Sequence, residues 1–336
     1  MRRQGNLVAW VVFALALASV PWWGLSRYYL NLLDQSMIFT IAVLGLYFVL
    51  GMAGQLSLAQ AAFFGLGAYV SAILNTRLGF PVWLDIPIAM IFAAVFGVIL
   101  GVPSLKLSGH YLAMTTIGFG IIVDLLFFNW RPVTGGADGI PGIQPTTLGG
   151  VSLAHPGLFF YVVFVFLALA VFVAVRVSRS RLGRALRAIR ENELAAEAVG
   201  VDSTRYKVAA FTLSAAYGGL AGALWTHFAL FVAPETFSFD VSVTMLAMLV
   251  IGGSTTVVGS VIGAFLLTLL PEFLRFLHNS YFAVYGAAII VMMVFMPDGI
   301  AGMATRLWWR ARGREEEAPR VLSQTGDLPS DASAAG

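Results

Sequence analysis

Long apolar runs separated by short polar connections follow one another along most of the chain. A helix rises about 1.5 Å per residue, so roughly 20 apolar residues are needed to cross the roughly 30 Å of hydrocarbon in a bilayer. The pattern therefore predicts an all-α fold: a polytopic membrane helix bundle with about ten transmembrane helices. The predicted spans cover residues 7–23, 36–53, 59–76, 83–102, 111–129, 157–177, 208–232, 241–253, 257–277 and 281–297.

Two of the predicted spans have a second interpretation. Span 241–253 is too short to cross a bilayer alone, and it runs into the sequence Gly-Gly-Ser-Thr-Thr. We expect a broken or re-entrant helix there, whose free backbone groups must be satisfied inside the bundle. Span 7–23 follows Arg2 and Arg3 and ends near small residues, a pattern that also fits a cleaved signal peptide. Cleavage would leave nine spans with the same orientation.

The basic residues support this count and indicate an orientation. If the N-terminus is cytoplasmic, the alternation of ten spans leaves 16 of the 20 Lys and Arg residues inside. Cytoplasmic connections of membrane proteins carry an excess of Lys and Arg. The charge bias thus predicts that both termini are cytoplasmic. The four basic residues predicted outside are Arg27, Arg77, Arg131 and Arg275.

The polar segments differ in composition. Segment 131–156 is too rich in Gly and Pro for a helix and is predicted to be an external loop. Segment 178–206 is rich in arginine and is predicted to be cytoplasmic. Residues 315–336 lack apolar periodicity, which predicts a disordered cytoplasmic tail. We therefore expect a transmembrane domain over residues 1–314, followed by this tail.

Composition argues against several classes of function. The chain is 59% hydrophobic and 11% charged, against about 45–50% and about 25% in soluble domains. Its net charge of +3 comes from basic residues that flank apolar spans, so nucleic acid is not an expected partner. There is no cysteine, and the four histidines are scattered, so we predict no metal site. Without a phosphate loop, a His-Glu-x-x-His helix or a convincing Ser/His/Asp set, we predict no catalytic residues and no cofactor.

Many of the 35 glycines lie inside predicted spans, often four residues apart. Examples are Gly97 with Gly101, and Gly218 with Gly222. Small residues at this spacing let helix backbones approach closely in lipid, where there is no hydrophobic drive for association. Close helix packing is therefore the favoured interpretation. The alternative is that some pairs allow helices to slide.

Polar side chains inside the spans are few and informative, because a charge at the bilayer centre costs about 2.5–3.5 kcal/mol on insertion scales. Asp124 is the one acid well inside a predicted span, and it either reaches interfacial water or faces a solute pathway. Two threonines precede it in the same span. Amide and hydroxyl groups also gather at the cytoplasmic junction of the second and third spans, as a polar connection or as part of a solute path. The candidate pathway residues are Gln55, Ser57, Gln60, Thr115, Thr116 and Asp124.

The segment 180–200 has an amphipathic pattern. Its apolar residues recur near helical spacing with charged residues between them, and Gly200 suits a C-terminal stop. This predicts a cytoplasmic amphipathic helix, after which Asp202 or Ser203 suits the N-cap of the next helix. The seven arginines between residues 176 and 207 favour a helix that lies on anionic lipid headgroups. The three acids of segment 180–200 and its defined stop favour a protein-docking face instead.

Five separated stretches, spread over roughly residues 40 to 300, match a known family in the family's order. They are 51–69 (GMAGQLSLAQAAFFGLGAY), 107–120 (LSGHYLAMTTIGFG), 134–140 (TGGADGI), 180–200 (SRLGRALRAIRENELAAEAVG) and 297–300 (PDGI). Through them the chain resembles the permease subunits of bacterial ATP-binding cassette (ABC) importers for branched-chain amino acids, in particular the LivM type.

The resemblance implies that the chain pairs with a second permease subunit, usually a related but distinct chain. It also implies two cytoplasmic ATP-binding subunits and a periplasmic or extracellular solute-binding protein. Residues Ala195, Ala196 and Gly200 match the cytoplasmic Glu-Ala-Ala-x-x-x-Gly loop of ABC importers, with Leu194 in the place of the glutamate. The expected ATPase-coupling residues are Arg187, Arg190, Glu191, Glu193, Ala195, Ala196, Glu197 and Gly200, of which Glu193 or Glu197 would replace the missing glutamate.

The expected function is a permease that moves branched-chain or related apolar amino acids into the cytoplasm by alternating access. ATP hydrolysis would take place on the partner subunits, so the chain itself is not expected to be an enzyme. It would reside in a bacterial plasma (inner) membrane, in contact with lipid. Departures from the family pattern leave the identity of the solute open. Tyr47 stands where Asn is common, and Ile121 stands where an acid is usual. Residues 254–256 (Ser-Thr-Thr) replace the more usual small apolar and glycine residues. The alternatives are a permease for urea, amides or another small solute, or an ATP-independent channel or secondary carrier.

Overall fold

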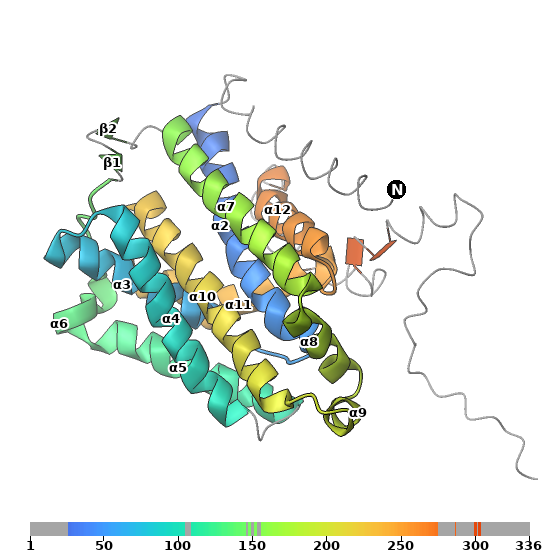
Figure 1. Ribbon diagram of the computed structural model, residues 1–336. Helices are drawn as coiled ribbons and strands as arrows, with labels where there is room; N and C mark the ends of the chain where they lie inside the picture. The colour runs from blue at the N-terminus through green and yellow to red at the C-terminus, as the bar shows by residue number, and fades with distance from the viewer. Residues whose placement is uncertain are drawn as a thin grey trace, which may run out of the picture.

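The computed structural model describes residues 26–104, 109–145, 147–148, 151–152 and 156–274, together with residues 286, 299–300 and 302–303. Over these residues the chain is almost entirely helical (Figure 1), which confirms the all-α fold. A two-residue hairpin of β1 (Thr147–Leu148) and β2 (Val151–Ser152) is the exception. The main helices are α2 (Arg27–Leu46), α3 (Gln60–Leu78), α4 (Val82–Ser104), α5 (His110–Asn129), α7 (Pro156–Arg179), α8 (Arg181–Glu191), α9 (Glu193–Ala198), α10 (Ser203–Ala229), α11 (Phe239–Gly252) and α12 (Val257–Phe273).

Each predicted span that begins within the described residues overlaps one of these helices, although α2 begins nine residues before its span 36–53. Six helical stretches in this part of the chain are long and apolar enough to cross a membrane, and Val257–Phe273 is a shorter apolar helix. The predicted spans 7–23 and 281–297 and the predicted tail 315–336 lie outside the described residues. The total of about ten spans therefore stays a prediction.

Helix α10 lies at the centre of the bundle and packs against α2, α3 and α4 (Figure 1). Its glycines allow this packing. A Cβ atom on Gly222 would overlap the carbonyl oxygen of Phe64 in α3, and one on Gly67 would overlap the backbone of Gly219. The structure thus confirms close helix packing at these glycines.

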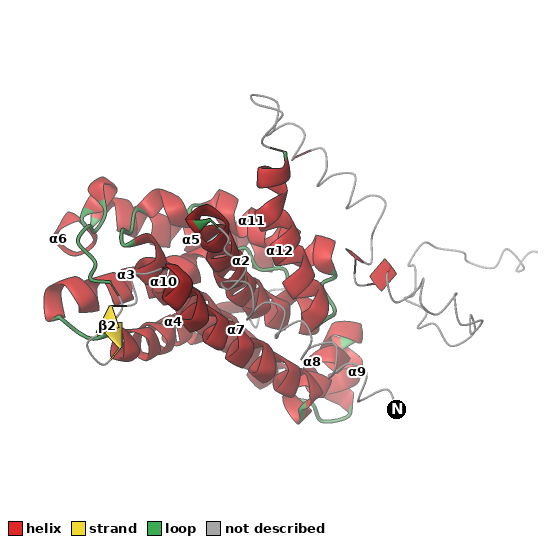
Figure 2. Cartoon of the chain, turned by 90° about the horizontal axis from the view of Figure 1, so that it is seen from above, coloured by secondary structure: helices red, strands yellow, loops and turns green. Residues whose placement is uncertain are grey.

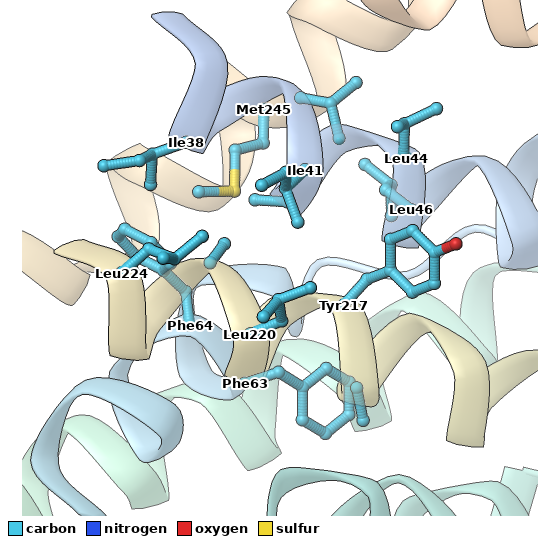
Figure 3. Packing of buried hydrophobic residues seen from close by; sticks show 14 of the residues in the cluster. Ile38, Ile41, Leu44, Leu46, Phe63, Phe64, Tyr217, Leu220, Leu224 and Met245 are labelled. Atoms are coloured by element: carbon cyan, nitrogen blue, oxygen red, sulfur yellow. The ribbon is translucent and has the colours of Figure 1, made fainter. Parts of the chain in front are cut away.

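The core is formed by apolar side chains that interdigitate between α2, α3, α10 and α11 (Figure 3). Ile38 and Ile41 of α2 face Met245 of α11 in this cluster, and Phe64 of α3 lies beside Leu224 of α10. All five side chains are buried. In a membrane such contacts stabilise the bundle by van der Waals packing, because lipid chains are as apolar as the core.

Helix α2 does not end as a regular α-helix. It continues as a π-helix, Tyr47–Met52, and an irregular segment, 54–59, then leads to α3. The side-chain amide of Gln60, at the start of α3, donates a 2.7 Å hydrogen bond to the carbonyl of Ala42 in α2. Since Ala42 lies ten residues before Met52, roughly 15 Å along a helix, segment 54–59 returns into the bundle and α3 begins beside the middle of α2.

Helix α11 has 14 residues, about 21 Å at 1.5 Å per residue, which is less than the roughly 30 Å of a bilayer core. A 3₁₀ turn, Pro234–Phe237, precedes it. Phe237 is buried against the rings of Phe64 and Phe127, and the Ser242 hydroxyl accepts a 2.9 Å hydrogen bond from the Ala61 N–H. The helix thus begins against buried residues of α3 and α5. Together with the preceding turn it forms Pro234–Gly252, one of the six stretches that are long and apolar enough to cross a membrane, so the broken or re-entrant segment stays a prediction.

The segment predicted as one amphipathic helix over residues 180–200 is two helices, α8 and α9. The backbone of Asn192 is extended, and its side-chain oxygen accepts a 3.0 Å hydrogen bond from the Ala195 N–H. Asn192 therefore acts as the N-cap of a new helix and interrupts the first one. Asp202 caps α10 by accepting from the Arg205 N–H at 3.1 Å, which confirms the predicted cap.

The predicted external loop 131–156 was expected to contain no helix, and this is wrong. It contains one helical turn, α6 (Arg131–Thr134), and a 3₁₀ turn, Gly136–Asp138, as well as the hairpin. Pro132 suits the first turn of a helix, and the Thr134 hydroxyl donates to the carbonyl of Phe127 at 2.8 Å. The hairpin and the α8–α9 pair lie at opposite ends of the bundle (Figure 2).

Candidate functional site

Helices α8 and α9 project from the end of α7, and their far end exposes apolar side chains. Leu194 is 79% exposed and Val199 is 80% exposed. Ala195 and Gly200 beside them are also exposed. Large apolar side chains exposed together at the end of a charged segment make this end a candidate contact site for another molecule. Sequence reasoning missed Leu194 and Val199 as contact residues, although two apolar residues on a polar helix were a visible signal.

Other residues of the segment hold it in place. Leu186 and Ile189 of α8 and Ala196 of α9 are buried. The Glu193 carboxylate accepts a hydrogen bond from the buried Lys207 ammonium, and the Ser203 hydroxyl donates to Glu197. Both acids therefore bind the first turns of α10.

The remaining predicted coupling residues lie on α8. Arg187 and Glu191 are exposed. Arg190 donates from Nη1 to the carbonyl of Gly51, at the end of the π-helix. All three residues are exposed, and the Arg190 guanidinium also contacts the bundle at Gly51.

The pathway candidates near the irregular segment 54–59 make contacts that hold helices together. Gln60 is buried; its amide donates to Ala42, and its side-chain oxygen accepts from the Ser214 hydroxyl at 2.8 Å, which ties α3 to α2 and α10. The Thr116 hydroxyl accepts from the Leu58 N–H at 3.0 Å. Its neighbour Thr115 donates to its own helix backbone. Backbone that leaves helical geometry at this depth needs such partners.

Two further candidates belong to the same segment. Ser57 is buried, and its hydroxyl accepts from the Ala59 N–H at 3.4 Å. The Gln55 side chain is half-buried, and its backbone N–H bonds the carbonyl of Val49 in the π-helix. Both residues thus lie in the irregular segment 54–59 between the π-helix and α3.

Asp124 lies five residues before the end of α5, near Tyr69 of α3. Its Oδ1 atom is buried and accepts no hydrogen bond from any described residue, and the same is true of the Tyr69 hydroxyl. The two groups are close enough to interact electrostatically, and the Tyr69 ring stacks on Phe127 with 4.2 Å between the ring centroids. Asp124 and Tyr69 therefore form a polar site between α3 and α5 that a cationic group would complement.

The amino-acid sequence is similar to those of known transport proteins. The family of branched-chain amino acid transport system permease components matches residues 28–297. The chain belongs to this family. The high-affinity branched-chain amino acid transport system permease LivM of Escherichia coli K12 is 36% identical over 326 residues, covering 89% of this chain and 77% of the relative.

More distant permeases are similar over most of their length. The probable branched-chain amino acid transport permease LivM of Methanocaldococcus jannaschii is 24% identical, over 83% of this chain and 91% of the relative. The ribose import permease RbsC of Haemophilus influenzae is 25% identical, over 81% and 85% respectively. No solved structure matches the chain significantly.

This permease buries a polar cluster that sequence reasoning missed. Asp85 of α4 and His227 of α10 lie in contact, and the Ser71 hydroxyl of α3 is 3.3 Å from the same histidine nitrogen. No spacing rule links them, since Asp85 and His227 are 142 residues apart. Asp34 was missed for another reason: α2 begins before the predicted span 36–53, so this acid is buried inside the helix. Among the described residues, no group of three or more His, Cys, Asp or Glu side chains could hold a metal ion.

Proposed function

We propose that this permease imports branched-chain amino acids across a bacterial inner membrane, and that ATP hydrolysed by partner subunits drives the transport. The observation that carries the proposal is the 36% identity to the LivM permease of Escherichia coli over 89% of the chain. The permease itself performs no covalent chemistry. It supplies the pathway, together with a second permease subunit that is a related but distinct chain.

The α8–α9 end is the proposed docking site for an ATP-binding subunit. Its exposed apolar residues, Leu194 and Val199, are surrounded by charged and small residues, as in the core and rim of a protein interface. Arg187, Glu191, Ala195 and Gly200 would contact the partner. Glu193, Ala196 and Glu197 would keep the docking surface in place through their contacts within the segment and with α10.

The proposed solute pathway runs along the irregular segment 54–59 and past Asp124. Non-helical backbone at membrane depth is tolerated where it is buried in protein or lines a water-filled cavity. An amino acid carries an ammonium group, which the Asp124 carboxylate and the Tyr69 hydroxyl would bind in transit. Gln60 positions this region through its hydrogen bonds to α2 and α10, and Thr116 does so through its hydrogen bond to the irregular segment 54–59.

Reconstitution in liposomes tests the proposal. The permease with its partner permease, both ATP-binding subunits and a solute-binding protein should accumulate leucine against a gradient only when ATP is hydrolysed. The permease alone should not accumulate leucine. The matched control is the same complex with a non-hydrolysable ATP analogue. Leucine movement through the permease alone, without ATP, would instead establish a channel or secondary carrier.

A second solute class is supported by the relatives, because a ribose import permease and an autoinducer 2 import permease are also similar to the chain. The same vesicles therefore distinguish the solutes. Accumulation of ribose or urea in place of leucine would keep the ABC importer and reject the amino acid.

A further inference from the structure

Arg190 connects α8 to the end of the helical run that starts with α2. Its guanidinium donates to the carbonyl oxygen of Gly51, which lies 139 residues earlier in the chain. The last carbonyls of a helix lack partners within the helix and carry partial negative charge. Arg190 supplies both a donor and a positive charge there, so it caps the π-helix from outside.

The two elements also touch through their carbon atoms. A Cβ atom on Gly54 would lie 2.8 Å from Cγ and 3.4 Å from Cβ of Arg190. Gly54 has a φ of +69°, which favours glycine. Helix α8 therefore packs directly on the turn that follows the π-helix, without a gap that would let one move independently of the other.

Gly51 also lies against the turn between α11 and α12. A Cβ atom on Gly51 would overlap the carbonyl oxygen of Ser254 in that turn. Within the turn, the Thr256 N–H bonds the carbonyl of Gly253 at 3.3 Å. Gly51 thus contacts both α8 and the α11–α12 turn.

The π-helix adds a side chain to the same junction. The ring of Tyr47 covers Gly51, and its hydroxyl faces Ser178 at the end of α7. It lies close enough to Arg187 and Arg190 to interact with them electrostatically. Single π-helical turns occur frequently at functional sites, since they are locally less regular than the α-helix around them.

We propose that the contact from Arg190 to Gly51 joins α8, the π-helix and the α11–α12 turn into one body, which carries movement of α8–α9 into the bundle. Arg190 is then a positioning residue and not a contact of the docked ATPase. Transmission between distant sites requires a continuous packed network, and Arg190, Gly51 and Ser254 supply one. The inference rests on the proposed function in one respect, namely that a partner subunit moves α8–α9.

Spin-label distances test the rigid body without reference to the solute. The chain has no cysteine, so one cysteine at each of the exposed positions Arg181 and Thr255 can carry the labels. In the complete transporter the distance should stay the same with and without nucleotide, and in the Arg190→Ala variant it should shift or broaden by about 2 Å, the size of helix shifts in switching transitions. Arg184→Ala is the matched control, because Arg184 bonds the carbonyl of Arg179 in its own segment. A distance in the parent protein that changes with nucleotide, or an unchanged distance in Arg190→Ala, would overturn the inference.

A disulfide provides a second test that does not depend on Arg190→Ala folding normally. The Cβ separation of 3.4 Å between positions 54 and 190 is close to the roughly 3.5–4.5 Å of disulfides. In the Gly54→Cys/Arg190→Cys double variant, leucine transported per ATP hydrolysed should fall at least about fivefold when reduced, the lower range of allosteric couplings, and recover on oxidation. Each single cysteine variant should show no recovery. Loss of transport on oxidation would show that the contact must open, and would overturn the inference. If the parent complex moves no leucine at all, the proposed function fails, while the spin-label distances still decide the inference.

Discussion

Asp85 and His227 form a buried polar pair across α4 and α10: the carboxylate Oδ2 lies 2.9 Å from Nε2 of the imidazole, and the two side chains are 0% and 1% exposed. Ser71 of α3 reaches the same nitrogen. Three helices that pack closely through glycines are thus also joined by hydrogen bonds at one point.

The Asp85→Ala variant is expected to lose about 1–3 kcal/mol of stability, because it removes one hydrogen-bond partner of the buried imidazole. Thermal unfolding of the purified permease in detergent measures this. Arg205→Ala is the control: its ion pair with Asp202 is exposed and worth about 0–1 kcal/mol. The double variant Asp85→Ala/His227→Ala should lose less than the sum of the single losses. Equal melting temperatures for Asp85→Ala and Arg205→Ala would contradict the pair's structural role.

Gly222→Ala is expected to destabilise the bundle by about 1–3 kcal/mol, as overpacking does, because the added Cβ would overlap the Phe64 carbonyl. Gly118→Ala is the matched control within another helix, since nothing lies within 4 Å of its Cβ position. The same unfolding measurement compares them. A Gly222→Ala protein as stable as Gly118→Ala would mean that α3 and α10 separate easily.

Leu194→Glu and Val199→Glu are expected to weaken binding of the ATP-binding subunits by at least about tenfold each, which corresponds to about 1.4 kcal/mol. Each change places a charge where the proposed interface is apolar. Co-purification and ATP hydrolysis by the assembled transporter measure the effect. Arg181→Glu, on the exposed start of α8, is the control for a change of surface charge. Normal assembly of both glutamate variants would rule out this end as the docking site.

Asp124→Asn is expected to reduce leucine uptake by about tenfold or more, because it removes the charge proposed to bind the ammonium group, while assembly stays normal. Tyr69→Phe should also reduce leucine uptake, but by a smaller factor, since it removes a neutral hydrogen-bond donor. Uptake into vesicles at several leucine concentrations separates a change in KM from one in kcat. Thr115→Val is the control, as its hydroxyl bonds only its own helix among the described residues. Unchanged uptake in Asp124→Asn would remove this residue from the pathway.

Single cysteines are expected to report the orientation, since the parent chain contains none. Val199→Cys should react with a membrane-impermeant maleimide only from the cytoplasmic side, and Ala137→Cys only from the outside. Both positions are exposed. Labelling of intact cells and of inverted vesicles makes the comparison. Labelling of both cysteines from one side would contradict the predicted alternation of spans.

The sequence by itself determined where the helices of the described bundle lie and which family the chain belongs to. Hydropathy acts over about 20 consecutive residues, and a cap such as Asp202 acts within one turn, so both are readable locally. Asn192 carried an equally local signal that was overlooked, and it divides the predicted amphipathic helix in two.

The tertiary structure alone decided which polar residues meet. The packing of α10 against α3 and α4 brings His227 to Asp85 and Ser71, and the return of segment 54–59 into the bundle sets Gln60 between α2 and α10. The contact of Arg190 with Gly51 arises in the same way, across 139 residues. Such pairs depend on helix packing and on the irregular backbone after the π-helix, and neither leaves a periodic pattern in the sequence.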